Sequence, residues 1–345
     1  MNAPDTLPTT RLGVDGPPVG VQGLGCMGMS EFYGPSDPKE CLKTLERALE
    51  LGVTLYDTAD NYGHGQNERL LAPFVRAHRD RVLVSTKFGL VRRADDPHYR
   101  GIDNSPGYLR TAVEGSLRRL GTDTIDLCIA HRLDPRTPVE DTVAEMAKLV
   151  DEGKVRLLGL SEVTGEELLR ANRVHPIAAV QSEWSLFSRE VEADVVPVAA
   201  ELGVVLMAYS PLGRGFLAGG FTSADQLSAN DYRRTMPRFT GENAQRNTAI
   251  LAPLHQIAAA GGATVAQIAL AWLHHRSAVH GLPVVPIPGT RSPARVEENT
   301  AAATLVLGAD ELAVLEPMAA QVSGSRLIGL NFTPQSESDR SGCPA

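Results

Sequence analysis

Four side chains capable of acid–base chemistry stand at or near the ends of predicted strands. Asp57, Lys87 and His131 each end a short apolar run, and Tyr62 follows Asp57 closely in the chain. Because a buried charge must be paired, we expect Asp57 and Lys87 to form an ion pair. A cation beside a phenol favours the phenolate, so Lys87 is expected to lower the pKa of Tyr62. Tyr62 would then donate a proton near neutral pH.

A purely structural role and a different lysine chemistry are also compatible with these residues. A structural polar network beneath the mouth of a barrel would also contain Asp57, Lys87 and His131. A Schiff-base aldolase would use Lys87 as its amine, and borohydride trapping of substrate onto Lys87 would reveal it. The remaining histidines show no spacing typical of zinc ligands, so no metal site is predicted.

The chain around these residues alternates between amphipathic and apolar stretches. From residue 37 onward, stripes with helical spacing precede short apolar runs, and the pattern repeats. Repeated units of this kind predict a parallel sheet covered by helices. Eight such strands predict a closed (β/α)8 TIM barrel, in which the strand C-termini face the active site. Periodicity alone leaves an open, doubly wound sheet as the alternative.

The predicted elements are spread along the whole chain. The strands are expected at residues 21–25, 53–57, 82–87, 125–131, 155–160, 178–181, 204–208 and 284–287. The helices are expected at residues 41–49, 67–78, 109–120, 139–150, 165–173, 192–202, 243–260, 265–276 and 293–303. The chain 1–345 is expected to form one domain, with its core at about 10–322.

Three segments fall outside this repeat. Residues 10–20 contain Asp15-Gly16, a turn pair typical of a β-hairpin, which we expect to lie across the barrel bottom. Residues 211–242 form a long glycine-rich connection, which suggests a functional loop. Residues 323–345 are polar and lack periodicity, so we expect a tail. Its apolar residues would be able to fold over a site: Ile328, Leu330 and Phe332.

Six motifs occur in order between about residues 10 and 305. They are Leu55-Tyr-Asp-Thr-Ala-Asp-Asn-Tyr-Gly63, Ser85-Thr-Lys87, Asp126-Leu-Cys-Ile-Ala-His131, Gly153-Lys-Val-Arg-Leu-Leu-Gly-Leu-Ser161, Tyr209-Ser-Pro-Leu-Gly-Arg-Gly215 and Ile287-Pro-Gly-Thr-Arg291. With these motifs the sequence resembles the aldo-keto reductase family, most closely its bacterial, plant and fungal branch. The resemblance implies an NADP-dependent enzyme that reduces aldehydes or ketones to alcohols by hydride transfer.

The resemblance also implies a role for each of the four residues. Tyr62 would be the general acid, and Lys87 the cation that tunes it. Asp57 would hold Lys87, and His131 would orient the substrate carbonyl with a hydrogen bond. Proton transfer of this kind contributes roughly 10²–10⁴-fold to the rate, so orientation of the cofactor and carbonyl must contribute much of the rest.

A nicotinamide cofactor, NADPH or NADP+, is implied with its own set of residues. Ser161 and Gln181 would hold the carboxamide, and Trp184 would stack on the ring. The other positions expected at the cofactor are Gly28, Met29, Ser210, Leu212, Arg214, Gly289, Thr290, Arg291, Arg295, Glu298 and Asn299. Planar guanidinium groups such as Arg291 and Arg295 suit a 2′-phosphate, so NADPH is expected over NADH.

The sequence departs from the family pattern at three of these places. Gly289 stands where a lysine often lies, and Arg291 is expected to compensate. Glu162 replaces the more common asparagine after Ser161. Trp184 replaces a more usual tyrosine and offers a similar flat face.

A glycine-rich stretch near the N-terminus has a second possible meaning. Gly23, Gly25 and Gly28 match the Gly-x-Gly-x-x-Gly spacing of a dinucleotide-binding fingerprint. No acidic residue is well placed for a ribose about 20 residues later. We therefore interpret the stretch as the first barrel strand and its loop, with glycines that let the backbone approach the cofactor.

The walls of the substrate pocket are expected from Met27, Tyr33 and Phe88. Their apolar and aromatic character fits aldehydes or ketones with a hydrophobic part. The alternative function is a regulatory subunit that binds the cofactor with little turnover, since a fold does not fix a function. NADPH oxidation with an activated aldehyde would distinguish the two.

Composition narrows the partners and the location. The net charge is −8 and no long basic run occurs, so a nucleic-acid partner is not expected. Neither a long apolar stretch nor an N-terminal signal is found, so no membrane association is expected. Scattered cysteines without metal-like spacing predict reduced thiols in the cytoplasm: Cys26, Cys41, Cys128 and Cys343. A monomer and a homo-oligomer are both compatible with the sequence.

Overall fold

The protein forms an eight-stranded parallel sheet that curls into a barrel. The computed structural model describes residues 7–92, 101–229 and 231–326. The strands are β3 (Leu24–Gly25), β4 (Leu55–Asp57), β5 (Leu83–Phe88), β8 (Ile125–Ala130), β9 (Val155–Ser161), β10 (Ile177–Glu183), β11 (Val205–Tyr209) and β12 (Val284–Pro286). Their order in the sheet is their order in the chain, from β3 to β12, as expected for repeated β–α units.

The two edges of the sheet meet and close the barrel. Gly25 forms a parallel bridge with Gly289, and Gly23 N donates to Pro286 O at 2.9 Å. A Cβ on Gly25 would lie 2.8 Å from Ile287 O, a distance that real Cβ atoms essentially never show. Gly25 therefore serves the close approach of the first strand to the last. The closed barrel is confirmed over the open sheet.

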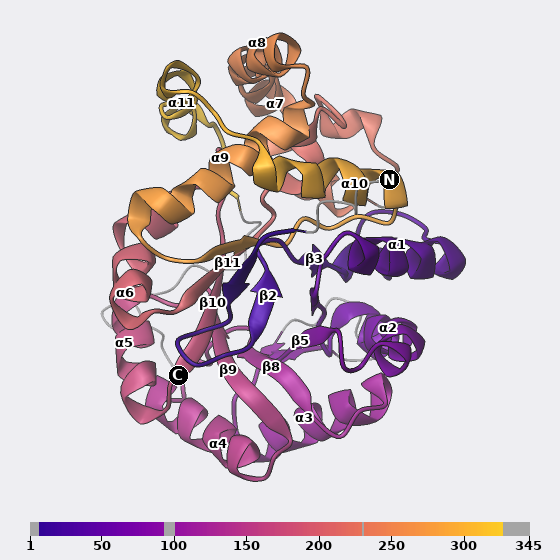
Figure 1. The fold of residues 1–345 in the computed structure, drawn as a ribbon, viewed down its shortest axis with the longest axis vertical. Helices are drawn as coiled ribbons and strands as arrows, with labels where there is room; N and C mark the ends of the chain where they lie inside the picture. Colours follow the sequence, from indigo (N-terminus) through magenta and orange to yellow (C-terminus); the bar gives the residue numbers. More distant parts are fainter. Residues whose placement is uncertain (1–6, 93–100, 230, 327–345) are drawn as a thin grey trace.

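In the part of the chain that the structure describes, eight helices pack around the strands (Figure 1). They are α1 (Pro38–Glu50), α2 (Gln66–Ala77), α3 (Pro106–Leu120), α4 (Val139–Asp151), α5 (Gly165–Val174), α6 (Val195–Leu202), α9 (Val265–His280) and α10 (Pro293–Ala301). Three more helices lie outside this ring, at the top of Figure 1: α7 (Gly241–Ile250), α8 (Ala252–Gly261) and α11 (Ala309–Leu315). The single helix predicted over residues 243–260 is instead broken at Leu251. Helix α11 is not among the predicted elements.

Local sequence explains where several helices begin and end. Asp37 caps α1 by accepting from Lys39 N, with Pro38 at the first helical position. Thr164 and Glu167 form a reciprocal capping box at the start of α5. Gly121 ends α3 in the left-handed conformation, as glycine does at many helix ends.

Alternation along the strands separates two apolar clusters. The smaller cluster contains alternate residues of several strands, such as Leu127 and Ile129 on β8 and Val205 and Met207 on β11, and none of its residues lies in a described helix. Because side chains alternate between the faces of a strand, these residues fill the barrel interior. The larger cluster joins the opposite faces, such as Tyr56 and Phe88, to the helices. This alternation determines which residues at the strand ends can face the mouth of the barrel.

The predicted N-terminal hairpin is confirmed. Strands β1 (Thr9–Arg11) and β2 (Pro18–Gly20) pair antiparallel, and Figure 1 shows them in front of the barrel strands. Leu12 and Val19 are fully buried in the interior cluster, so the hairpin plugs that end of the barrel. A second hairpin, β6 (Leu90–Val91) with β7 (Gly101–Ile102), was not predicted.

The long connection after β11 has a structure of its own. It contains the short 3-10 helices η4 (Gly213–Ala218), η5 (Ala224–Gln226), η6 (Tyr232–Thr235) and η7 (Pro237–Phe239). Phe221 packs against Phe216 and Phe239 with ring centroids 5.3 and 5.2 Å apart. The segment thus carries a small aromatic core, which fixes its position beside the barrel mouth.

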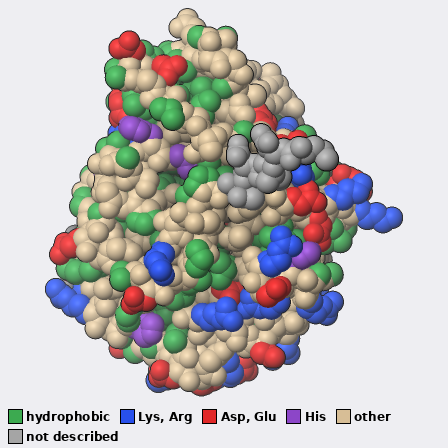
Figure 2. All heavy atoms as spheres, in the orientation of Figure 1, with side chains coloured by type: hydrophobic (Ala, Val, Ile, Leu, Met, Phe, Trp, Pro, Cys, Tyr) green, Lys and Arg blue, Asp and Glu red, His purple; other side chains and the backbone are tan. Residues whose placement is uncertain are grey.

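The surface shown in Figure 2 mixes acidic and basic side chains, and no large region of one sign gathers among the described residues on this face. Within the described ranges, no single helix is long and apolar enough to cross a membrane. Only a pair bent by 97°, Gly241–Gly261 with Val265–His280, meets that requirement together. The tail predicted at residues 323–345 lies mostly outside the described residues, including Ile328, Leu330 and Phe332.

Candidate active site

The four acid–base residues predicted from the sequence meet at one end of the barrel. Asp57 ends β4, Lys87 lies near the end of β5, and His131 directly follows β8. These three strands are neighbours in the sheet, in the order β8-β5-β4. Tyr62 begins η2 (Tyr62–Gly65), the short 3-10 helix that follows β4. All four side chains are at most 9% exposed.

Lys87 is the centre of this group. Its Nζ donates to Asp57 Oδ2 at 2.6 Å, to Thr58 O at 2.8 Å and to Tyr62 OH at 3.3 Å. Asp57 Oδ1 accepts from Ser85 Oγ at 3.0 Å and from Gln181 Nε2 at 2.9 Å. The expected ion pair therefore exists, and both carboxylate oxygens are satisfied by hydrogen bonds.

The alternation of side chains along a strand explains why Asp57 and Lys87 both face the interior of the barrel. Leu55 and Asp57 face inward on β4, with Tyr56 outward between them. On β5, Lys87 faces inward, whereas Phe88 is 1% exposed and belongs to the outer cluster. The prediction that Phe88 lines the substrate pocket is therefore wrong, because the next residue along a strand points to the opposite face.

The charges of the group follow from burial. Burial raises the pKa of Tyr62 and outweighs the lowering effect of the Lys87 ammonium. The expected lowering of the Tyr62 pKa is thus corrected, since the phenol is almost wholly removed from water. Burial alone would lower the pKa of Lys87, but the Asp57 carboxylate and Tyr62 together raise it. Lys87 is therefore a cation, and Tyr62 keeps its proton.

His131 lies beside Tyr62 as a neutral ring. The two ring centroids are 6.0 Å apart with an interplanar angle of 82°. Burial, together with the charges of Lys87 and Arg132, holds the pKa of His131 well below its ordinary value of 6.5. Its Nδ1 is buried and has no hydrogen-bond partner in the described part of the chain. A neutral imidazole of this kind can offer one N–H to a ligand.

Ser161 and Gln181 lie on the strands that continue around the barrel. Ser161 ends β9, and its Oγ accepts from Arg132 Nη1 at 3.1 Å. Gln181 on β10 pairs in register with Ser161 and directs its amide to Asp57. Both are at most 3% exposed. The two residues expected at the carboxamide are therefore adjacent to each other and connected to the acid–base group.

Trp184 does not lie where a ring-stacking residue would be needed. Its side chain is 0% exposed and belongs to the outer cluster. Its Nε1 donates to Glu192 Oε1 at 2.9 Å, and its ring packs against His280, with centroids 5.6 Å apart. The expectation for Trp184 is wrong, because it follows the last residue of β10 on the outward side.

Tyr209 is the aromatic residue that sequence reasoning missed. It ends β11, opposite Glu183 of β10, and packs against the interior cluster. Its OH donates to Glu162 Oε1 at 2.9 Å. The signal was present in the sequence, because Tyr209 opens the motif Tyr-Ser-Pro-Leu-Gly-Arg-Gly at the end of a predicted strand.

The chain turns sharply after Tyr209. Ser210 and Arg214 have positive φ values of 49° and 57°, which side chains other than glycine rarely adopt. Arg214 approaches Tyr33 OH at 3.5 Å and Glu183 Oε2 at 3.9 Å, and its side chain is 11% exposed. Leu212 packs partly buried against the outer cluster. Ser210 and Arg214 are thus held in a strained turn at the barrel mouth.

The first loop, residues 30–37, reaches across to the residues just before α10. Arg291 donates from Nη1 to Gly34 O and Pro35 O, at 3.1 and 2.6 Å, and from Nη2 to Tyr33 O at 3.0 Å. Arg291 therefore binds this loop as well as standing near α10. Among the other positions expected at the phosphate, Gly289 and Arg295 are exposed. Thr290 Oγ1 accepts from Ser292 N at 3.1 Å before α10.

The remaining expected positions lie on either side of this loop. Asn299 is 5% exposed on α10, and Glu298 O accepts from Gln267 Nε2 at 3.1 Å. Met29 is 2% exposed in the outer cluster, so only its backbone is available to a ligand. Met27 and Gly28 lie in η1 (Met27–Met29), and both are partly exposed.

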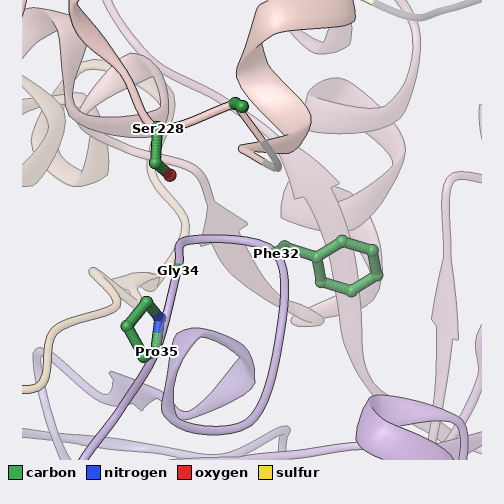
Figure 3. Close-up of a pocket in the computed structure, with 5 residues that line it drawn as sticks. Phe32, Gly34, Pro35 and Ser228 are labelled. Atoms are coloured by element: carbon green, nitrogen blue, oxygen red, sulfur yellow. The ribbon is translucent and has the colours of Figure 1, made fainter.

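A cavity of about 370 Å³ lies beside the mouth, between the first loop and the segment before η6. Its lining includes Phe32, Gly34, Pro35 and Ser228. Figure 3 shows Ser228 facing the Gly34–Pro35 turn across the gap. Phe32 and Tyr232 connect the same two segments, with Tyr232 N donating to Phe32 O at 3.2 Å. The acid–base group does not line this cavity.

Glu162 and Arg326 form a second buried ion pair that was not predicted. Arg326 Nη2 lies 2.7 Å from Glu162 Oε2, with side-chain exposures of 14% and 2%. Burial opposes the charge of Glu162, but Arg132 and Arg326 lower its pKa overall. The sequence marks Glu162 as a departure after Ser161, but it cannot identify a partner so distant in the chain.

The chain is similar to proteins of one enzyme family along almost its whole length. The Aldo/keto reductase family matches it over residues 23–319. The glycerol dehydrogenase AKR11B4 from Gluconobacter oxydans is 29% identical, with a TM-score of 0.80 over 93% of this chain and 97% of that one. An aldo/keto reductase from Klebsiella pneumoniae, in complex with NADP and acetate, is 27% identical, with a TM-score of 0.67 over 94% and 97%.

A further structure shows the same fold at lower identity. The aldo-keto reductase AKR11C1 from Bacillus halodurans is 23% identical, with a TM-score of 0.72 over 95% of this chain and 99% of that one. The barrel, its N-terminal hairpin and the family match agree with one another. The chain therefore belongs to the aldo-keto reductases, a family of carbonyl oxidoreductases that use nicotinamide cofactors.

Proposed function

We propose that this protein is an NADPH-dependent reductase that converts aldehydes or ketones to alcohols. In this proposal Tyr62 is the general acid that protonates the carbonyl oxygen. Lys87, held by Asp57, stabilises the negative charge that develops on the Tyr62 oxygen as its proton leaves. His131 orients the carbonyl with a hydrogen bond from its neutral ring.

The observation that carries the proposal is the position of the Lys87 ammonium. It lies 2.6 Å from Asp57 Oδ2 and 3.3 Å from Tyr62 OH, beside the neutral ring of His131. Because burial raises the pKa of Tyr62, the phenol still holds its proton at neutral pH. A proton donor beside a fixed cation is what reduction of a carbonyl requires, because oxygen becomes negative as the carbon gains a hydride.

The side chains at the mouth fit an anionic dinucleotide. Tyr209 offers a flat aromatic surface at the end of β11. Arg214 is partly buried, and its Nε has no hydrogen-bond partner among the described residues. The N-terminus of α10, with exposed Arg295 in its first turn, suits a phosphate. When bound, the nicotinamide supplies the hydride.

We assign the cofactor contacts on this basis. Ser161 and Gln181 hold the carboxamide, and Tyr209 takes the ring-stacking role that the sequence suggested for Trp184. Arg214 with Ser210 and Leu212 lies at the pyrophosphate, and Arg295 with Thr290 at the 2′-phosphate. The NADP complex of the similar Klebsiella pneumoniae protein supports this preference. Met27 and Tyr33 are the proposed contacts to the carbonyl substrate.

The positive charge of Lys87 favours a role in carbonyl reduction over Schiff-base chemistry. A Schiff base needs a neutral amine as the nucleophile. The pKa of Lys87 is raised by Asp57 and Tyr62 against the opposing effect of burial. Its Nζ is also engaged by three oxygen acceptors. Lys87 is therefore assigned to charge stabilisation.

A panel of aldehydes and ketones, assayed by loss of NADPH absorbance, tests the proposal. Wild-type protein should oxidise NADPH with at least one activated aldehyde. Tyr62→Phe should lose at least about 100-fold in kcat while its NADPH affinity, measured by fluorescence titration, stays near wild type. Wild-type turnover by Tyr62→Phe would remove the acid role. Tight NADPH binding without turnover at any pH would favour a cofactor-binding regulatory subunit.

Domain organisation and location complete the proposal. We propose one domain over residues 1–345, with its core at about 10–322, and a cytoplasmic location. Cys26, Cys41 and Cys128 are buried free thiols in the described chain, which suits a reducing compartment.

A further inference from the structure

The segment Ser323–Arg326 is held tightly against α7 and the connection that precedes it. Asn247 Oδ1 accepts from Ser323 N at 2.8 Å, and its Nδ2 donates to Ser323 O at 2.9 Å. Arg238 Nε donates to Gly324 O at 3.2 Å. Both backbone groups of Ser323 are therefore fixed by one buried side chain.

Gly324 is required for this docking. Its φ is +90°, and a Cβ there would lie 2.9 Å from Asn243 Nδ2 and 3.0 Å from Arg238 N. Any larger residue would strain the backbone and push the segment outward. The turn at Gly324 thus fixes the path along which the chain carries Arg326 toward the barrel mouth.

Arg326 bridges two carboxylates at the ends of neighbouring strands, Glu162 directly after β9 and Glu183 as the last residue of β10. Its guanidinium lies 2.7 Å from Glu162 Oε2 and 3.4 Å from Glu183 Oε2. The carboxylate side chains are only 2% and 4% exposed. The next cations to Glu183 are more distant, with Arg214 at 3.9 Å and Arg238 at 3.8 Å. Without Arg326, Glu162 would lose its 2.7 Å charge-assisted hydrogen bond in a buried site.

The same network holds Tyr209. Glu162 Oε1 accepts from Tyr209 OH at 2.9 Å and from Glu183 N at 3.0 Å. Arg326 Nη1 donates to Tyr209 OH at 3.3 Å. Glu162 also follows Ser161 directly, in a backbone conformation with φ of 53°. Arg326 therefore contacts Tyr209 directly and also binds the residue that follows Ser161.

We propose that Arg326 is a positioning residue of the cofactor site, by which the C-terminal segment fixes the Tyr209 ring and offsets the charge of Glu162 and Glu183. This inference rests on the proposed function, because it needs a nicotinamide at Tyr209 and Ser161. The oxidised nicotinamide ring carries a positive charge, and the reduced ring does not. A cation that balances the two carboxylates therefore favours NADPH over NADP+ at this site.

The test compares affinities for NADPH and NADP+, measured by fluorescence titration of the full chain. In Arg326→Met, NADPH binding should weaken about tenfold, because Tyr209 loses one of its two hydrogen bonds and Glu162, which makes the other, loses its ion pair with Arg326. NADP+ binding should weaken less, because Glu162 and Glu183 are then less fully balanced by cations and attract the oxidised ring. The ratio of the two dissociation constants should shift toward NADP+ by at least about threefold.

Three further variants separate positioning from general stability. Arg326→Lys should restore part of the effect, since an ammonium keeps the charge but loses the forked geometry. Glu162→Gln combined with Arg326→Met should return the NADPH to NADP+ ratio toward wild type, because one of the two negative charges is removed. Gly324→Ala keeps every charge but displaces the segment, so NADPH binding should weaken here also.

Arg119→Met is the matched control. Arg119 pairs with Glu68 at 2.5 Å, with exposures of 21% and 0%, between α2 and α3. Its loss should lower the melting temperature as Arg326→Met does, without changing the ratio of affinities. A ratio unchanged in Arg326→Met, with only the melting temperature lowered, overturns the inference alone. A wild-type protein that neither binds NADPH nor reduces carbonyls overturns the proposed function as well.

Discussion

Lys87 and Asp57 form an ion pair 2.6 Å long inside the barrel, with side-chain exposures of 0% and 5%. Such a pair contributes little net stability, because desolvation of both charges offsets their attraction. Removal of one partner is far more costly than the pair is favourable, since the other charge is left buried and unpaired. The pair is therefore best explained by what the ammonium does at Tyr62.

Lys87→Met should separate stability from catalysis. The free energy of unfolding should fall by about 3–5 kcal/mol, because Asp57 is left as an uncompensated buried charge. Adding Asp57→Asn should recover much of that stability but none of the lost carbonyl reduction. Urea denaturation and NADPH oxidation measure the two properties. Full stability in Lys87→Met would mean that Asp57 is neutral or hydrated in the folded protein.

The pH profile of reduction should be flat through the neutral range. Reduction needs the proton on Tyr62, whose pKa burial raises above its ordinary value of 10.0. His131 stays neutral because its pKa is held well below 6.5. We expect kcat/KM for the carbonyl at saturating NADPH to vary little from about pH 6.5 to 9 and to fall only at higher pH. A descending limb centred near pH 7 would show that Tyr62 is a stronger acid than its burial implies.

Arg295 and Arg291 should differ in how they affect the two cofactors. Arg295 is exposed in the first turn of α10, so Arg295→Ala should weaken NADPH about tenfold, or about 1.4 kcal/mol, and leave NADH nearly unchanged. Arg291 also holds the loop carbonyls of residues 33–35. Arg291→Ala should therefore weaken both cofactors. Titration with each cofactor checks this, and equal weakening by Arg295→Ala would refute its 2′-phosphate role.

Gly25→Ala should destabilise the barrel at its closing seam. The added Cβ would meet Ile287 O at 2.8 Å, so β3 and the chain after β12 must separate. We expect a loss of roughly 1–3 kcal/mol in the free energy of unfolding. Gly107→Ala is the control, because its Cβ would meet no atom within 4 Å in helix α3. That variant should be stabilised by up to about 1 kcal/mol.

The sequence predicts the repeated β–α units and the acid–base group because both depend on local periodicity, although periodicity alone left an open sheet as the alternative. Apolar runs fix the strands, and strand ends must converge in a parallel barrel. Asp57, Lys87 and His131 therefore come together from their places in the pattern alone. The hairpin was also predictable from Asp15-Gly16, although its turn spans residues 13–16 and its positive φ is at Gly13.

The incorrect predictions arose from the alternation of side chains between the two faces of a strand and from contacts between residues that are far apart in the sequence. Phe88 and Trp184 stand at strand ends, but each lies one position away from an inward-facing residue, which places it against the helices. Tyr62 lies beside a cation as expected, yet burial has the larger effect on its pKa. The Arg326–Glu162 pair joins segments whose proximity no local pattern specifies.

Closure of the barrel through Gly25 and Gly289 also constrains the order of folding. The bridge joins the first barrel strand to residues beyond the last, so it cannot form until nearly the whole chain has been synthesised. Until then β3 presents an unpaired strand edge, which can pair with other chains. The N-terminal half of the sheet must therefore remain protected from association while the ribosome completes the C-terminal half.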